Sequence, residues 1–136
     1  MSANIRLWLA RLLIFSVTVW TLQAALAFIL WPDAYSPGFE LSGLPGAVAV
    51  RGTGLLFLMW NLPYLVALWH PLRYRLALKL ALAMQTVGLV GESLIFLGLT
   101  PGHVLLQASI LRFILFDAAG LVALAAAFWL GRKESR

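Results

Sequence analysis

Two residues of opposite charge, Glu92 and Arg112, each lie inside a long apolar stretch of the chain. The two stretches meet at the short turn Thr-Pro-Gly-His at 100–103, and the two charges lie at nearly equal distances from it along the chain. A charged side chain in hydrocarbon is costly, so it turns toward a partner or toward a functional site. The spacing predicts an ion pair between Glu92 and Arg112. That pair either fixes the register of two helices or forms part of a ligand or proton site.

Other polar residues fall into two layers when their depth in the membrane is counted from the end of each stretch that lies away from the basic residues. At about 1.5 Å per residue, an outer layer at about 7–15 Å contains Gln23, Arg51, Glu92 and Arg112, and an inner layer near about 22 Å contains Ser16, Asn61, Gln85 and Asp117. Asp117 then has two amide donors within reach, those of Gln85 and Asn61. Arg51 either shares Glu92 or extends to the nearby membrane surface.

Together these side chains predict a polar seam inside a helical bundle. Its predicted members are Arg51, Glu92, Arg112, Asp117, Asn61, Gln85 and Gln23. Gln85, Gly88 and Glu92 share one stripe of a helix by their spacing. Small residues let membrane helices approach closely, so this stripe is expected to face the last apolar stretch. The seam either stabilises the bundle or binds a ligand, and the sequence fits both interpretations.

Familiar catalytic and metal-binding patterns do not occur in the chain. It has no cysteine, which excludes disulfides and thiolate metal sites. His70 and His103 are expected at opposite ends of the bundle, where they cannot share a metal. Asp33 and Glu40 are expected to be solvated surface charges. We therefore predict no catalytic residue, no metal and no cofactor; enzymatic activity stays open, with a non-enzymatic role favoured.

Four apolar stretches must position these residues, at 7–31, 46–69, 77–99 and 104–130. The chain is 62% hydrophobic and 11% charged, whereas a soluble domain is about half apolar and about a quarter charged. Each stretch is long enough to cross a hydrocarbon core of about 30 Å as a helix. The sequence predicts an all-α, integral membrane four-helix bundle that forms a single transmembrane domain over residues 1–136. The Pro-, Gly- and Ser-rich segment 34–45 is predicted to be a loop.

The basic residues that flank the stretches gather at one end of the predicted bundle. They are Arg6, Arg11, Arg73, Arg75, Lys79, Arg132, Lys133 and Arg136. By the positive-inside rule, both termini are predicted to be cytoplasmic, in a multi-pass protein of the inner membrane. These clusters explain the formal charge of +5, so no nucleic-acid partner is expected.

The first stretch has an alternative interpretation. Arg6 and Arg11, the apolar run and Ala-Leu-Ala at 25–27 resemble a secretory signal with a small-residue cleavage site. Cleavage there leaves three spans and places the new N-terminus outside. The apolar run continues to Trp31, and Gln23 matches the depth of the outer polar layer, which favours an uncleaved helix.

Three segments of the chain carry a resemblance to known proteins. They are the run from Pro45-Gly46 through Gly54-Leu55-Leu56-Phe57 to Met59-Trp60-Asn61-Leu62-Pro63-Tyr64, then Gln85-Thr86-Val87-Gly88-Leu89-Val90-Gly91-Glu92-Ser93, and Arg112-Phe113-Ile114-Leu115-Phe116-Asp117 with Gly120-Leu121. They resemble the DoxX-like and BphX-like small membrane proteins, and the length, the spans and the short loops agree over nearly the whole chain. The resemblance implies a four-helix membrane fold and, for most members, no assigned activity. Some DoxX-type proteins are linked to quinone or sulfur redox systems, but no residue here carries that chemistry over.

Three functions fit this pattern. The favoured one is non-enzymatic: the seam binds a lipid-like or amphipathic ligand, or a partner membrane protein. The second is a small transporter or channel subunit. It requires a homo-oligomer or a larger membrane complex, because four short spans rarely enclose a pathway alone. The third is a quinone-linked membrane redox subunit. In each of them the lipid bilayer surrounds the bundle.

Overall fold

The computed structural model describes residues 2–132 and is helical throughout its regular elements, as predicted. In chain order, the elements are α1 (Ala3–Leu30), α2 (Pro32–Tyr35), the short 3-10 helix η1 (Ser36–Phe39), α3 (Gly43–Trp69), α4 (Arg75–Gly98) and α5 (Val104–Arg132). Lys133 and Arg136, two of the basic residues from which the orientation is predicted, lie outside the described residues.

By length and composition, α1, α3, α4 and α5 can each cross a membrane. They have between 24 and 29 residues, which is about 36–44 Å at about 1.5 Å per residue. Their outward surfaces are apolar: Leu97 is 79% exposed and Trp69 is 78% exposed. Such a surface is unfavourable in water and suits hydrocarbon, which supports a multi-pass membrane protein.

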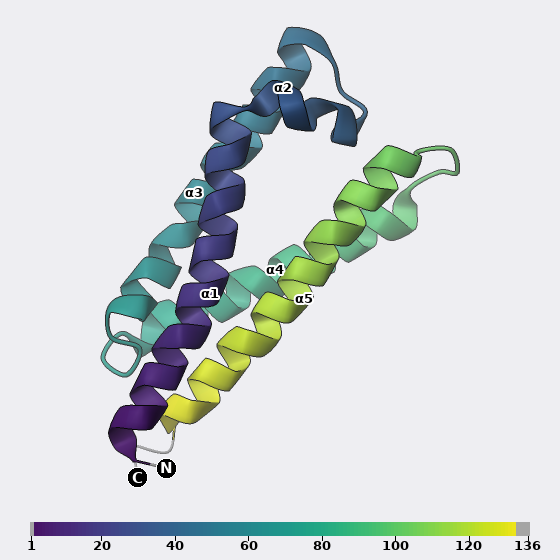
Figure 1. The fold of residues 1–136 in the computed structure, drawn as a ribbon. Coiled ribbons are helices and arrows are strands. Elements are labelled where there is room, and N and C mark those ends of the chain that lie inside the picture. Colours follow the sequence, from purple (N-terminus) through teal and green to yellow (C-terminus); the bar gives the residue numbers. More distant parts are fainter. Residues whose placement is uncertain (1, 133–136) are drawn as a thin grey trace.

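Two antiparallel hairpins make up the bundle, α1 with α3 and α4 with α5 (Figure 1). α1 also packs against α5, and α3 against α4, so the four long helices form a ring. The beginning of α1 and the end of α5 lie together at what we call the closed end (Figure 1). From there the two hairpins spread apart toward the opposite, open end. α2 and η1 lie at the open end, and η1 reaches from the first hairpin to α5.

The buried core lies toward the closed end. Its members come from all four long helices: Ala10, Ile14, Val17, Tyr64, Ala67, Leu78, Ala81, Leu124 and Ala127. Alanine lets helix backbones approach closely, and in lipid this close packing stabilises helix association because burial of apolar surface adds little. The core therefore holds the four helices together at one end and positions the polar groups just beyond it.

Residues 34–45, predicted to be a loop, are partly helical. Pro32 lies in the first turn of α2 and Pro37 in that of η1, where the missing proline N–H costs no hydrogen bond. The Ser36 hydroxyl donates to the Pro32 carbonyl at 2.9 Å. η1 ends at Phe39, and the residue that follows, Glu40, has a left-handed backbone with a φ of 56°. The loop prediction was wrong in part because proline and serine favour both turns and the first turns of helices.

Candidate functional site

Three adjoining cavities lie between the hairpins along α1. The inner cavity, of about 210 Å³, is lined from α1, α4 and α5, and the central cavity, of about 310 Å³, from all four long helices. The outer cavity, of about 420 Å³, lies nearest the open end and is lined from α1, α2, η1 and α5. Trp20 and Phe116 line all three, and their ring centroids are 4.3 Å apart in edge-to-face contact. These two rings form the wall that the cavities share.

Aromatic side chains surround the outer cavity. The ring of Phe28 contacts those of Tyr35, Phe39, Phe57 and Phe113, with centroid distances between 5.0 and 6.1 Å. Pairs of this kind contribute about 0.5–1.5 kcal/mol beyond the burial of their area. The cluster joins α2 and η1 to α1, α3 and α5. It gives the open end an aromatic interior in place of the alanine-rich core.

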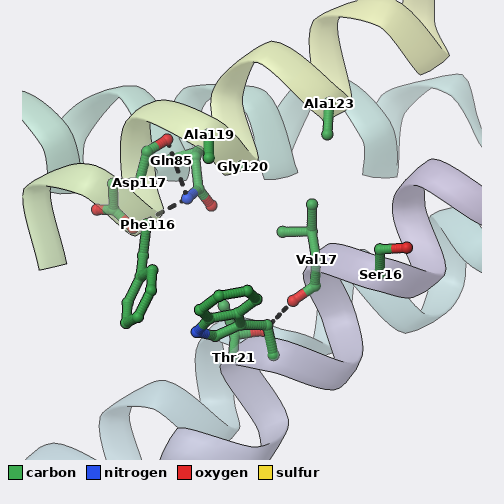
Figure 2. Close-up of a pocket in the computed structure, with 10 residues that line it drawn as sticks. Ser16, Val17, Thr21, Gln85, Phe116, Asp117, Ala119, Gly120 and Ala123 are labelled. Carbon is green, nitrogen blue, oxygen red and sulfur yellow. Dashed lines mark hydrogen bonds between the residues drawn. The ribbon is translucent and has the colours of Figure 1, made fainter. Parts of the chain in front are cut away.

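A chain of hydrogen bonds connects α3, α4 and α5 beside the inner and central cavities. Trp60 Nε1 donates to the Tyr64 hydroxyl at 3.2 Å, and that hydroxyl donates to Gln85 Oε1. Gln85 Nε2 donates to Asp117 Oδ1 at 2.9 Å, and Figure 2 shows this contact between α4 and α5. Gln85 is only 2% exposed, so its polar atoms depend on these partners. The predicted contact between Gln85 and Asp117 is confirmed.

Two glycines make room for this contact. A Cβ at Gly120 of α5 would lie 2.6 Å from Gln85 Nε2, and a Cβ at Gly88 of α4 would collide with Asp117 Oδ2. Each helix thus has a glycine where the polar side chain of the other helix lies. A Cβ at Gly91 would meet no atom within 4 Å. The expectation that this stripe faces the last helix is confirmed for Gln85 and Gly88. Its third member, Glu92, lines the central cavity.

Asn61 does not reach Asp117, so that part of the prediction was wrong. Asn61 Oδ1 lies 2.7 Å from the Thr21 hydroxyl of α1, and Asn61 Nδ2 donates to the Phe57 carbonyl at 2.8 Å. The ring order of the helices explains the difference, since within residues 2–132 α3 packs against α1 and α4 and not against α5. Ser16 also remains outside the chain of hydrogen bonds, because its hydroxyl donates to the Leu12 carbonyl.

Glu92 and Arg112 do not form the predicted ion pair. Over residues 2–132, no carboxylate oxygen lies within 4.0 Å of an Arg112 nitrogen. Glu92 lines the central cavity, where its Oε2 is buried without a hydrogen-bond partner, whereas Arg112 lines the outer cavity. Equal depth does not fix rotation about the helix axis. Arg112 precedes Asp117 by five residues, or about 140° around a helix, so it turns away from α4 when Asp117 faces it.

Arg51 has a partner that the sequence did not indicate. Its Nε donates to the Ile29 carbonyl at 3.2 Å, next to the end of α1 at Leu30. Carbonyls at a helix C-terminus carry partial negative charge, and a cation there contributes about 0.3–1 kcal/mol. Arg11 makes the same kind of contact at the closed end, where it donates to the Trp69 carbonyl at 2.7 Å. Arg51 is therefore a helix-capping residue in this structure, and it does not share Glu92.

The predicted seam is thus divided between two cavities. Glu92, Gln85 and Asp117 line the central cavity, and Arg112 and Gln23 line the outer one. Arg112 and Gln23 make no hydrogen bond within the part of the chain that the structure describes. A charged side chain within a membrane span is costly and usually faces the bundle interior or a water-filled cavity. The outer cavity therefore holds a cation that the fold itself leaves uncompensated.

Glu40, expected to be a solvated surface charge, and His103, expected at one end of the bundle, join the two hairpins at the open end. Glu40 Oε2 lies 2.5 Å from His103 Nδ1, and Glu40 Oε1 accepts from the Leu106 backbone at 3.4 Å. The Ser109 hydroxyl donates to the Gly38 carbonyl at 2.6 Å beside them. We call these contacts the outer clasp. The hydrogen bond with His103 holds the pKa of the Glu40 carboxyl below its ordinary value of 4.5, and desolvation opposes this effect.

Tyr64 and Thr21 belong to the polar interior but were not among the predicted site residues. Tyr64 is fully buried and links Trp60 to Gln85. A signal for it was present, because Trp60, Asn61 and Tyr64 fall on one face of a helix by their spacing. Thr21 carried no comparable signal, since a threonine in a membrane helix usually bonds to its own backbone.

Comparison of the chain with protein-family models, with curated proteins and with solved structures gives no match. The similarity to DoxX-like and BphX-like proteins therefore stays a prediction.

Proposed function

We propose that the protein binds an amphipathic, lipid-like ligand in the outer and central cavities. The observation that carries this proposal is the pairing of aromatic walls with unbonded polar groups in two adjoining cavities of about 420 and 310 Å³. Small-molecule sites usually have about 300–1,000 Å³, mostly apolar walls and a few polar groups that orient the ligand. The two cavities have this size and this composition.

The arrangement of the hairpins supports entry from the bilayer. The hairpins diverge toward the open end (Figure 1), and the outer cavity lies between α1 and α5 at that end. A ligand dissolved in the membrane enters laterally there, with its polar end near Arg112 and its apolar part along the shared wall of Trp20 and Phe116. The inner cavity, of about 210 Å³, falls below the usual size and is not part of the proposed site.

The distribution of charge supports an orientation for this site. Basic residues at the start of α1 and between α3 and α4 lie at the closed end, which by the positive-inside rule faces the cytoplasm. The outer cavity then lies toward the other face of the inner membrane. We propose that both termini are cytoplasmic and that the protein is a relative of the DoxX-like small membrane proteins.

Binding is proposed in preference to catalysis because the cation Arg112 and the carboxyl groups of Glu92 and Asp117 line different cavities. Glu92 and Arg112 line different cavities, and Gln85 is held by Tyr64 and Asp117. General acid–base chemistry needs groups within hydrogen-bond reach of the same reacting atoms. Orienting a ligand needs only one or two polar contacts at its end.

A substitution that fills the cavities tests the proposal. Ala24 lines both the central and the outer cavity, so Ala24→Trp places a large ring inside the site. Ala126→Trp adds the same side chain at an exposed position of α5 and serves as the control. The probe is a dansyl-labelled medium-chain fatty acid in lipid nanodiscs, read by energy transfer from tryptophan. We expect Ala24→Trp to weaken saturable binding by about tenfold or more, as loss of a site requires, with the control close to wild type. Equal binding by both variants and by the wild type overturns the proposal.

A further inference from the structure

Arg112 lies in the outer half of a membrane helix without an anion of its own. It is eight residues from the start of α5 at Val104, about 12 Å along the helix axis. Among residues 2–132, its guanidinium has no carboxylate within 4.0 Å and no hydrogen-bond acceptor. A carboxyl group in apolar surroundings can become neutral by taking up a proton, but a guanidinium keeps its charge. Arg112 is exposed on the bundle, so its guanidinium is free to take a negative group from outside the fold.

The other arginine of the open end shows how this fold satisfies such a charge. Arg51 donates to the Ile29 carbonyl at the end of α1. Among the acids near the open end, Glu40 is held by His103 and by the Leu106 backbone in the outer clasp. The outer cavity is thus left with a cation, whereas Arg51 and Glu40 at the same end already have partners.

The surroundings of Arg112 favour the polar end of an amphiphile. Gln23 of α1 and Tyr35 of α2 line the same cavity, and neither side chain has a hydrogen bond in the described part of the chain. Three donors from three helices therefore border one space. Beyond them, Phe113 and Phe116 continue the wall from the outer into the central cavity. Polar donors at one end and aromatic rings along the rest match a charged head and an apolar chain.

We propose that Arg112 binds the anionic headgroup of a membrane amphiphile, a phosphate or a carboxylate, with Gln23 and Tyr35 donating to the same group. The inference rests on the proposed function and names the class of its ligand. A guanidinium presents two parallel N–H donors that match two oxygens of a phosphate or carboxylate. The apolar chain of the ligand runs along Phe113 and Phe116 toward the central cavity.

Two probes that differ only in their headgroup test this inference. A dansyl-labelled fatty acid and the corresponding fatty alcohol are titrated against protein in nanodiscs of zwitterionic lipid. We expect the wild type to prefer the acid. Arg112→Gln should weaken binding of the acid by about tenfold or more, the usual effect of losing a charged hydrogen bond, and leave binding of the alcohol nearly unchanged. Arg73→Gln removes an exposed cation between α3 and α4 and should leave both affinities unchanged.

The outcomes separate this inference from the proposed function. If Arg112→Gln, shown to be folded by thermal unfolding, binds the acid as well as the wild type does, the headgroup assignment is overturned while cavity binding stands. If the wild type binds neither probe, the proposed function itself fails. Displacement of the acid by millimolar inorganic phosphate also overturns the inference, because a free anion then occupies Arg112 without an apolar chain. Displacement by phosphatidylglycerol but not by inorganic phosphate supports it.

Discussion

The two ends of this bundle are held together by different interactions. At the closed end, alanines and fully buried side chains such as Ile14 and Leu124 pack four helices directly against one another. At the open end, aromatic rings, two cavities and the outer clasp lie between hairpins that have spread apart. The comparison assigns stability to the closed end and the proposed ligand site to the open end. Substitutions at the two ends should therefore have different effects.

The largest expected effect is at the closed end. Leu124 is fully buried, and Leu124→Ala leaves a space among close-packed helices. Such changes cost about 2–5 kcal/mol in soluble proteins, and the lower limit applies here because leucine gains little by leaving lipid for the protein interior. We expect a loss of about 2 kcal/mol, measured by thermal unfolding in one mild detergent. Leu97→Ala, at an open-end position that is 79% exposed, is the control and should change the free energy of unfolding by less than about 0.5 kcal/mol. Similar losses in the two variants contradict a division of stability between the ends.

A smaller effect on the free energy of unfolding is expected at the boundary between the closed-end core and the cavities. Gly88→Ala places a methyl group against Asp117 and forces the Gln85 contact apart. Overpacking costs about 1–3 kcal/mol, and the better helix propensity of alanine offsets about 1 kcal/mol of that cost. We expect a net loss of about 1 kcal/mol in unfolding free energy. Gly91→Ala, one turn along the same helix in open space, should be neutral or slightly stabilising. A loss at Gly91 equal to that at Gly88 contradicts the role given to Gly88.

The smallest expected effect concerns the outer clasp and its dependence on pH. The pKa of Glu40 is lowered in the folded protein, so its contribution is present above its ordinary value of 4.5 and is lost as pH falls through the lowered pKa. The rate of backbone hydrogen exchange in residues 36–42, corrected for intrinsic rates, should therefore increase as the pH falls through the lowered pKa of Glu40. The closed-end core should show no matching change. Glu40→Gln should abolish the pH dependence, and Asp33→Asn should preserve it. If hydrogen exchange in Glu40→Gln depends on pH as it does in the wild type, the outer clasp is not the cause of that dependence.

The positions of the long helices could be predicted because apolar length alone decides them. The start of α5 at Val104 and the end of α3 at Trp69 fall where the apolar stretches begin and end. The contact of Gln85 with Asp117 was also predictable, since Gly88 and Gln85 share a face and small residues mark where helices meet.

The remaining contacts depend on quantities that a single sequence does not contain. Glu92 and Arg112 match in depth, but their separation follows from the rotation of each helix about its axis. Arg51 bonds to a backbone carbonyl, which no residue pattern displays. Glu40 and His103 are 63 positions apart, and their contact depends on how η1 crosses from one hairpin to the other. Asn61 was assigned to the wrong helix because the ring order of the helices was unknown.

The most direct test of the central claim is native mass spectrometry of the protein released from its own membranes in mild detergent. Wild type, Ala24→Trp and Ala126→Trp are compared in parallel. We predict that wild type and Ala126→Trp carry a bound amphiphile with an acidic headgroup and that Ala24→Trp, which fills the cavities, does not. The same lipid bound equally to all three would contradict ligand binding between the hairpins.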